Sequence, residues 1–304
     1  MSDVLTKALV LVLIIALGFG VKRLGWVRAS DFGVFSRVVL GVTLPCALAT
    51  SFNTFDITPQ LLFVTGIGFF AVVVQQVLVV LALRKRGHRE QAFGVLNVPN
   101  YNVGLFAIPY VSTFMGPSAI VFASLFDIGN SLATAGVGYS WGLSLANPRS
   151  KTTPLGFLRT MLKSPVFNTY LILLAIRLPG FSIPAPVIAF TSTVGAANTF
   201  LAMFMIGIGL EIALTRTKYV KAAGYLASRY AFSTVLILLV WFLVPAAADV
   251  KTVLCMLFFA PMAAMSVGFT GEAGLDVELA SFMSSASVLI GIVAMPAVLG
   301  LLSI

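Results

Sequence analysis

Long apolar runs dominate this chain and constrain its fold more than any other feature. Residues Thr58–Leu83 and Val277–Leu302 each exceed the roughly 20 residues that a helix needs to cross a bilayer. Only 10% of the residues are charged, whereas soluble domains carry about 25%. The pattern predicts an all-α integral membrane protein, because a helix satisfies its own backbone polar groups in lipid.

Ten apolar segments follow one another along the chain, separated by prolines and basic loops. They are Leu5–Val21, Phe32–Thr50, Thr58–Leu83, Gln91–Thr113, Ser118–Leu145, Pro165–Leu178, Pro186–Leu214, Ala222–Val244, Thr252–Phe269 and Val277–Leu302. Ten crossings with short loops account for the 304 residues and leave no room for a large soluble domain. The first segment lacks a small-residue cleavage pattern, so we interpret it as a retained helix rather than a signal peptide.

Lys and Arg residues gather in every second loop and thereby orient the segments. Sixteen of the 19 basic residues lie in four groups on one side: Lys22, Arg23, Arg28, Arg37; Arg84, Lys85, Arg86, Arg89; Arg149, Lys151, Arg159, Lys163; and Arg216, Lys218, Lys221, Arg229. Cytoplasmic loops are enriched in Lys and Arg, so both termini are predicted to be extracytoplasmic. The net charge of +9 reflects these loops and does not indicate nucleic-acid binding. We expect a multi-pass protein of the cell membrane, with the lipid bilayer as its surroundings.

The basic stretch Asn147–Ser164 divides the segments into two sets of five. An odd number of crossings gives the two sets opposite orientations, so residues 1–150 and 151–304 are predicted to form an inverted repeat. The fourth segment carries Pro99 and the ninth carries Pro261 near its middle. Prolines that interrupt corresponding segments of two halves indicate a transporter's substrate site. The alternative is a pair of ordinary proline kinks satisfied by neighbouring helices.

The stretch Leu96–Tyr110 concentrates polar and helix-breaking residues inside an apolar region. A broken helix is tolerated in a membrane only where the break is buried in protein or lines a wet cavity. Helix N-termini at such breaks favour an anion, and no Lys or Arg is predicted near the middle of a segment. Backbone amides and carboxamides would then bind the substrate. The predicted substrate contacts are Pro99, Asn100, Tyr101, Asn102, Pro261 and Met262.

Asp127 lies at the middle of the fifth segment, with Asn130 on the same helical face. A charged Asp at the bilayer centre costs roughly 2.5–3.5 kcal/mol, and such residues usually mark ion or proton pathways. One interpretation is a coupling site for H⁺ or Na⁺ formed by Asp127 and Asn130. The other is a structural Asp bonded to the freed amides of the fourth segment. A carboxylate near the site repels an anion unless it is protonated or paired with a cation, which motivates the coupling hypothesis.

Further polar residues are candidates for lining the same cavity, namely Gln75, Asn97, Ser266, Ser284 and Ser287. Helix–helix hydrogen bonding is the competing role for Gln75, and close helix packing is the competing role for the serines. The sequence shows no clustered acids or metal-spaced ligands, and its one histidine, His88, lies in a basic loop. We therefore predict no metal, no cofactor and no enzymatic activity.

Several short motifs give the chain a resemblance to a known family over essentially its whole length. They are Leu44-Pro45, Asn100-x-x-x-Gly104 continuing to Ile108-Pro109, Asp127, Ser164-Pro165 and Pro184. On these residues the chain resembles the auxin efflux carrier family of membrane permeases, which belongs to a superfamily that includes bile-acid, arsenite and riboflavin carriers. Two positions depart from the family: Ser164 stands where an Asn is usual, and Met262 follows Pro261 where the family has an amide side chain.

The resemblance implies both an architecture and a function. It implies two inverted five-helix repeats with broken, crossing fourth and ninth helices, a scaffold of segments 1, 2, 6 and 7, and a moving unit of segments 3–5 and 8–10. It also implies a homodimer interface on the scaffold. Bacterial members include candidate malate and malonate carriers. We expect a secondary transporter of small organic anions, such as mono- or dicarboxylates, with elevator-type alternating access. The alternatives are a sodium-coupled bile-acid-type symporter and an anion channel.

Overall fold

A computed structural model describes residues 2–56, 58–147, 161–211 and 213–302. Within these ranges every regular element is a helix and no strand occurs, so the prediction of an all-α protein is confirmed. Seven helical runs are long and apolar enough to cross a membrane: Val4–Arg23, Ala29–Asn53, Phe63–Ala82, Pro117–Ala146, Ala185–Gly209, Arg216–Leu243 and Val277–Leu302. The predicted boundary between the repeats, at residues 150 and 151, lies outside the described residues.

The seven runs contain one or several helices each. Their α-helices are α1 (Ser2–Arg23), α2 (Phe32–Val38), α3 (Leu44–Asn53), α4 (Phe63–Ala82), α7 (Pro117–Ser131), α8 (Tyr139–Ala146), α11 (Ala185–Ala196), α12 (Asn198–Gly209), α13 (Tyr219–Leu243) and α16 (Val277–Leu302). The π-helices η2 (Val39–Thr43) and η5 (Leu132–Gly138) join α2 to α3 and α7 to α8. The 3-10 turns η1 (Ala29–Asp31), η3 (Pro59–Leu62) and η6 (Arg216–Lys218) precede α2, α4 and α13.

Among the described residues there are also five shorter α-helices: α5 (His88–Asn97), α6 (Ile108–Met115), α10 (Pro165–Arg177), α14 (Ala248–Leu257) and α15 (Met265–Glu272). A π-helix, η4 (Val103–Ala107), leads directly into α6. The helix is interrupted over residues 98–102, between α5 and η4, and again over residues 258–264, between α14 and α15. Pro99 and Pro261 lie in these two interruptions, as their missing amide donors predict.

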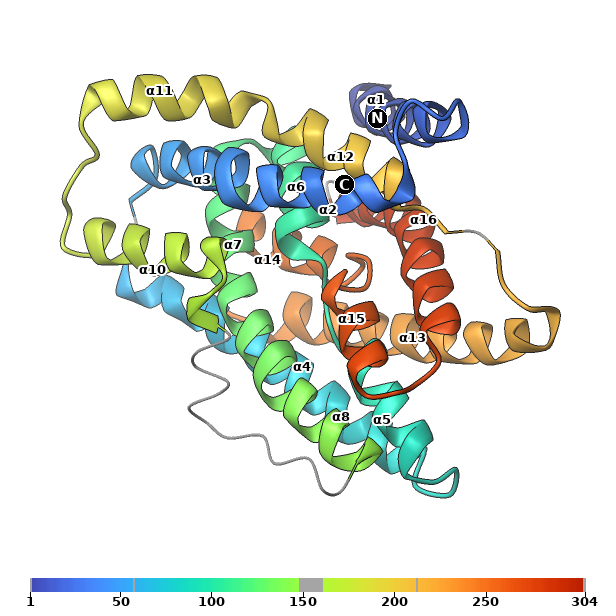
Figure 1. Ribbon diagram of the computed structural model, residues 1–304. Coiled ribbons are helices and arrows are strands. Elements are labelled where there is room, and N and C mark those ends of the chain that lie inside the picture. Colours follow the sequence, from blue (N-terminus) through green and yellow to red (C-terminus); the bar gives the residue numbers. More distant parts are fainter. Residues whose placement is uncertain (1, 57, 148–160, 212, 303–304) are drawn as a thin grey trace.

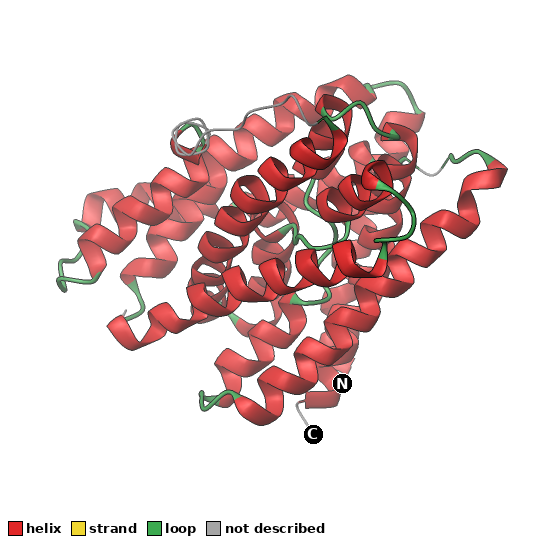
Figure 2. Cartoon of the chain, turned by 90° about the horizontal axis from the view of Figure 1, so that it is seen from below, coloured by secondary structure: helices red, strands yellow, loops and turns green. Residues whose placement is uncertain are grey.

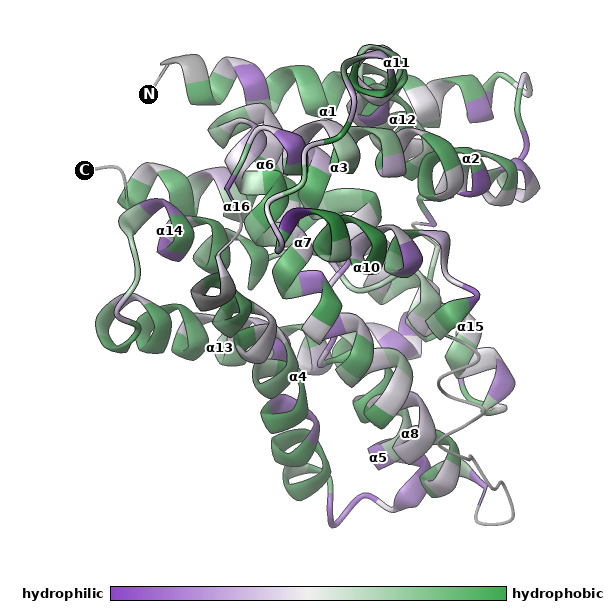
Figure 3. Cartoon of the chain, turned by 90° about the vertical axis from the view of Figure 1, so that its left-hand side faces the viewer, coloured by the Kyte–Doolittle hydropathy of each residue, from purple (hydrophilic) through white to green (hydrophobic). Residues whose placement is uncertain are grey.

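Large apolar side chains cover much of the outer surface. Phe70 is 65% exposed, Val220 85% and Val293 70%. Figure 3 shows the hydrophobic colouring continuing over the outward faces of helices such as α1 and α4. A soluble monomer rarely exposes apolar patches of this extent, so these faces are suited to lipid. The chain is therefore a multi-pass membrane protein by its helix lengths and by its surface.

The helices pack as two groups (Figure 1). In the first group, α1 and α2 pack on α12, and α3 packs on α10 and α11. In the second group, α4 packs on α7, α5 on α8 and α15, α14 on α7 and α16, and α13 on α14. A Cβ at Gly18 would lie 2.1 Å from the Phe204 oxygen, and one at Gly68 would lie 2.2 Å from the Phe126 oxygen. Glycine thus permits the close helix contacts within each group, and Figure 2 shows the resulting bundle from below.

Candidate functional site

The two helix interruptions meet inside the second packing group and bond directly to each other. The backbone amide of Asn102 donates to the Pro261 carbonyl at 2.8 Å. In the reverse direction, the Ala263 amide donates to the side-chain oxygen of Asn100 at 2.7 Å. Because a membrane interior offers no water to unpaired backbone groups, these reciprocal bonds explain how both interruptions are accommodated.

Arg229 joins the same two interruptions from α13, and its position corrects the sequence analysis. The charge pattern assigns Arg229 to a cytoplasmic loop and predicts no basic residue near the middle of a segment, but Arg229 lies within α13 and is 1% exposed. Its guanidinium donates to the Ala260 carbonyl at 2.8 Å and also to the Val98 carbonyl. These carbonyls precede the two prolines, so one buried cation satisfies the equivalent freed acceptor in each interruption.

Three further side chains bond to the freed backbone groups. Asn130 accepts from the Tyr101 amide at 3.1 Å and donates to the Tyr101 carbonyl at 2.9 Å. Ser287 accepts from the Met262 amide at 2.9 Å. Ser233 donates to the Phe258 carbonyl at 2.5 Å. The polar residues around the interruptions therefore pair with backbone groups that the irregular, buried structure would otherwise leave unsatisfied.

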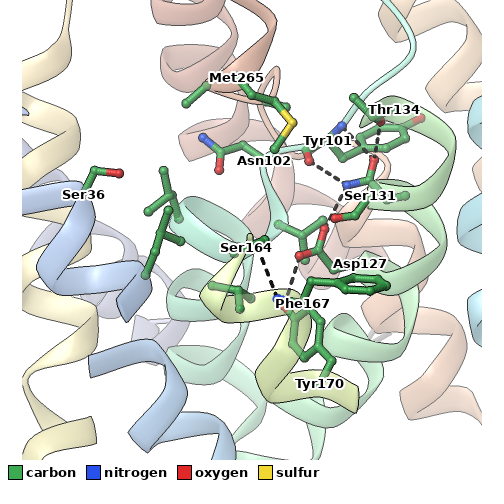
Figure 4. Close-up of a pocket in the computed structure, with 18 of the residues that line it drawn as sticks. Ser36, Tyr101, Asn102, Asp127, Ser131, Thr134, Ser164, Phe167, Tyr170 and Met265 are labelled. Carbon is green, nitrogen blue, oxygen red and sulfur yellow. Dashed lines mark hydrogen bonds between the residues drawn. The ribbon is translucent and has the colours of Figure 1, made fainter. Parts of the chain in front are cut away.

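A cavity of about 340 Å³ lies beside this junction, between the two packing groups. One wall comes from the first group and the other from the second, as Figure 4 shows with Ser36 lying across the cavity from Asp127. The lining residues are Phe32, Ser36, Leu40, Tyr101, Asn102, Val103, Gly104, Leu105, Asp127, Asn130, Ser131, Thr134, Ser164, Val166, Phe167, Tyr170, Ala263, Ala264 and Met265. Its size is that of a small-molecule site.

Among the described residues that line the cavity, Asp127 alone is charged. One of its oxygens accepts from the Asn130 amide at 2.9 Å, and the other accepts from the Tyr170 hydroxyl at 3.0 Å. Tyr170 belongs to α10, so this bond joins the two packing groups. The sequence alone also allowed a structural role for Asp127, namely bonds to the freed amides of the fourth segment. In the structure Asn130 makes such bonds, to the backbone of Tyr101.

Two helix N-termini face the cavity. Val103, Gly104 and Leu105, at the start of η4, line it, and so does Met265 at the start of α15. The first amides of a helix lack intrahelical acceptors and carry a partial positive charge. The cavity therefore combines a carboxylate with positive backbone potential, and the two lie close together, since a Cβ added at Gly104 would lie 3.8 Å from an Asp127 oxygen.

The structure separates the predicted substrate contacts into two sets. Tyr101 and Asn102 line the cavity, as do Asp127 and Asn130. Pro99, Asn100, Pro261 and Met262 lie in the interruptions themselves and are absent from the lining. Asn100 is fully buried and uses its amide on the Leu96 carbonyl and the Ala263 amide. In this conformation its side chain ties the two interruptions together.

The further candidates for lining the cavity, Gln75, Asn97, Ser266, Ser284 and Ser287, are absent from the lining of the main cavity. Gln75 donates to the Tyr101 hydroxyl at 2.5 Å, and Asn97 donates to the Thr270 hydroxyl at 2.9 Å. Ser284 lines a smaller neighbouring cavity of about 60 Å³ that also contacts Asn102. Ser266 is buried, and its hydroxyl has no partner among the described residues. Ser287, which holds the Met262 amide, contributes to the junction rather than to the cavity wall.

Sequence reasoning missed several lining residues and the buried arginine. Ser131 and Thr134 lie four residues after Asp127 and Asn130, so helical spacing could have revealed them. Ser36, Ser164 and Tyr170 come from the first packing group and are brought to the site only by tertiary packing. No local pattern in α2 or α10 marks their inward faces.

The chain matches no protein-family model. It also has no significant match among curated proteins. Among the described residues, no three His, Cys, Asp or Glu side chains gather closely enough to hold a metal ion. The resemblance to auxin efflux carriers therefore stays a prediction, and the function has to be argued from the junction and its cavity.

Proposed function

We propose that this protein is a secondary transporter of small organic anions, such as mono- or dicarboxylates. The observation that carries the proposal is the polar cavity where two interrupted helices meet, between two packing groups. Interrupted helices that aim their ends at one point are the usual construction of a carrier's substrate site. In this proposal the chain is a member of the auxin efflux carrier family and lies in the cell membrane.

Ten crossings form the proposed topology. Seven are the long helical runs, and the others are α10, the pair α5 and α6, and the pair α14 and α15. In Figure 3 the first turns of α1 and the last turns of α16 lie at the same side of the molecule, which suits an even number of crossings. With the basic loops on the cytoplasmic side, both termini are extracytoplasmic, and the two halves form an inverted repeat.

The proposed anion binds without a basic side chain in direct contact. In the part of the chain that the structure describes, no Lys, Arg or His lines the cavity. The amides at the starts of η4 and α15 and the carboxamide of Asn102 provide the donors. Phe32, Leu40 and Phe167 provide apolar surface for a carbon skeleton. Binding by backbone dipoles is modest, which suits a carrier that must release its cargo.

In the proposed mechanism Asp127 binds the coupling ion. A carboxylate in the same cavity repels an anionic substrate unless a proton or Na⁺ accompanies it. Asn130 and Tyr170 each donate to one oxygen of Asp127, so the carboxylate is held in a fixed orientation toward the cavity. A proton on Asp127, or Na⁺ beside it, neutralises the site while the anion is bound.

Alternating access in this proposal is a movement of the second packing group against the first. The cavity wall is divided between the groups, so their relative displacement changes which side of the membrane the cavity faces. The Tyr170–Asp127 hydrogen bond crosses the boundary at 3.0 Å and has to break during that movement. The first group is the scaffold in this mechanism.

Uptake by purified protein in proteoliposomes tests the proposal. Labelled malonate, malate and acetate are offered with and without a proton or Na⁺ gradient. A carrier gives saturable uptake that unlabelled substrate on the far side accelerates by exchange. Flux that rises linearly with concentration and shows no exchange contradicts the carrier and favours the anion channel, whereas strict Na⁺ dependence favours the sodium-coupled symporter.

A further inference from the structure

A second cavity, of about 610 Å³, is lined by residues of α4 and α13. We propose that it is a binding site for an anionic phospholipid. Its lining residues are Val79, Ala82, Leu83, Arg86, Val98, Thr217, Val220, Lys221, Gly224, Tyr225, Ser228 and Phe232. This site does not depend on the transported substrate, because it shares no lining residue with the substrate cavity.

The chemistry of the second cavity divides along its length. Away from the basic ends of α4 and α13, apolar side chains such as Val79 and Phe232 line it. Its mouth lies at the basic end of the helices and carries Arg86 and Lys221. A phospholipid presents the same division, with acyl chains on one side and a phosphate on the other, and basic pockets between transmembrane helices bind such head groups.

Arg86 is the main candidate for contact with the phosphate. It lies in the exposed turn after α4, and its charge acts on Glu90 without a hydrogen bond or ion pair to that residue. Lys221, in contrast, is bonded to Glu90 at 2.6 Å. Glu90 also accepts from the Tyr225 hydroxyl at 2.7 Å, so its carboxylate lies beside the lining residues Lys221 and Tyr225 and neutralises Lys221, which leaves Arg86 as the cation for the phosphate. Arg84, Lys85 and Arg216 flank the mouth in sequence and add to its positive charge.

The floor of the second cavity connects the lipid site to the helix junction. Val98 lines the cavity, and its carbonyl accepts a hydrogen bond from Arg229. An acyl chain in the second cavity packs beside this already buried bond and adds apolar contacts around it. We therefore expect lipid occupancy to stabilise the interrupted helix and to raise the melting temperature of the protein.

Gly224 offers a way to fill the second cavity without disturbing the fold. A Cβ added at Gly224 meets no atom within 4 Å, and the residue lies inside α13, where leucine is a better helix former than glycine. The Gly224→Leu side chain would therefore occupy the space that an acyl chain takes. Gly20 in α1 is a matched control, because a Cβ there also meets nothing within 4 Å and the residue lies near the basic end of its helix.

The test measures the melting temperature of detergent-purified protein with added phosphatidylglycerol, phosphatidylcholine or inorganic phosphate. We expect phosphatidylglycerol alone to stabilise the wild type and Gly20→Leu, and we expect Gly224→Leu to lose the shift. Arg86→Gln removes one cation and should need about fivefold more lipid, the factor that corresponds to about 1 kcal/mol per basic side chain. Native mass spectrometry should find fewer bound anionic lipids on both variants.

Three results would overturn the proposed lipid site. The first is an equal shift with phosphatidylcholine, which means an unspecific lipid effect. The second is stabilisation by inorganic phosphate alone, which means an anion site without a chain pocket. The third is an unchanged phosphatidylglycerol shift in both Gly224→Leu and Arg86→Gln. Because Arg86 lies in an exposed turn, that variant keeps the test valid even where Gly224→Leu folds poorly.

Discussion

The side-chain oxygen of Asn100 accepts a hydrogen bond from the backbone amide of Ala263, 2.7 Å away and 163 residues later in the chain. The bond joins the two helix interruptions, since Asn100 follows Pro99 and Ala263 follows Pro261 by two residues. An amide side chain beside one proline therefore serves the backbone beside the other. The two halves of the chain depend on each other at this point.

Replacing Asn100 with Ala should destabilise the protein. The change leaves the Ala263 amide buried without an acceptor, and an unsatisfied buried group costs about 1–3 kcal/mol. We expect a lower melting temperature for Asn100→Ala and little change for Asn168→Ala, whose side chain donates to the Leu162 carbonyl at an exposed site. Equal melting temperatures for Asn100→Ala and the wild type would show that this bond contributes nothing to the junction.

Replacing Arg229 should have a larger effect. Arg229→Met removes a charged donor from the carbonyls of Val98 and Ala260, and the loss of two such bonds costs roughly 3 kcal/mol or more. Arg216→Met removes an arginine from the exposed turn η6 and serves as the control. Thermal unfolding in detergent should show a large decrease for Arg229→Met alone. Similar stability of the two variants would contradict the bridging role of Arg229.

Asp127→Asn should remove the cation dependence of transport. The variant keeps the shape of the side chain and its capacity to accept from Tyr170, but it cannot carry a proton or pair with Na⁺. We expect uptake in proteoliposomes to become independent of pH and of Na⁺. Tyr170→Phe should retain the dependence, because the carboxylate remains. If Asp127→Asn responds to pH and Na⁺ as the wild type does, the coupling role belongs to another residue.

The loop before α16 gives a prediction of pH dependence. Partial burial of Asp276 favours its protonated form, but hydrogen bonds from Lys218 and from the Leu279 amide outweigh this effect and hold the pKa of Asp276 below its usual 3.8. A lowered pKa means stability that is present above pH 3.8 and lost as the pH falls through the folded-state value. Melting temperatures of the wild type and Asp276→Asn should therefore converge on acidification. A constant difference down to pH 3 would contradict this assignment.

The sequence predicted the general fold because the features that indicate it, apolar length and the positions of prolines, are local. Apolar length identifies helices that can cross a membrane, and Pro99 and Pro261 mark the interruptions because proline lacks an amide donor wherever it stands. The partners of the freed backbone groups come from distant segments. Whether Arg229 belongs to a loop or to the interior depends on where α13 begins, and a charge pattern alone placed it in the loop.

The candidate site was predicted in part, because some of its residues are recognisable from local sequence and others are not. Asn102 and Asp127 are polar residues within apolar segments, so each is recognisable without a structure. Asn100 has the same sequence signature, yet its side chain is used between the interruptions, because the irregular backbone directs the side chains of Asn100 and Asn102, two residues apart, to different partners. Tyr170 reaches Asp127 from the other packing group, and only the packing of α10 reveals it.

The central claim is that the cavity beside Asn102 binds a small organic anion. The most direct measurement is the thermal shift of purified protein with malonate, malate and acetate, for the wild type, Asn102→Asp and the control Asn168→Asp. Asn102 lines the cavity, so Asn102→Asp places a second carboxylate there. We predict stabilisation of the wild type and the control by at least one carboxylate, and none for Asn102→Asp. An equal shift in Asn102→Asp, or no shift of the wild type with any carboxylate, would contradict the claim.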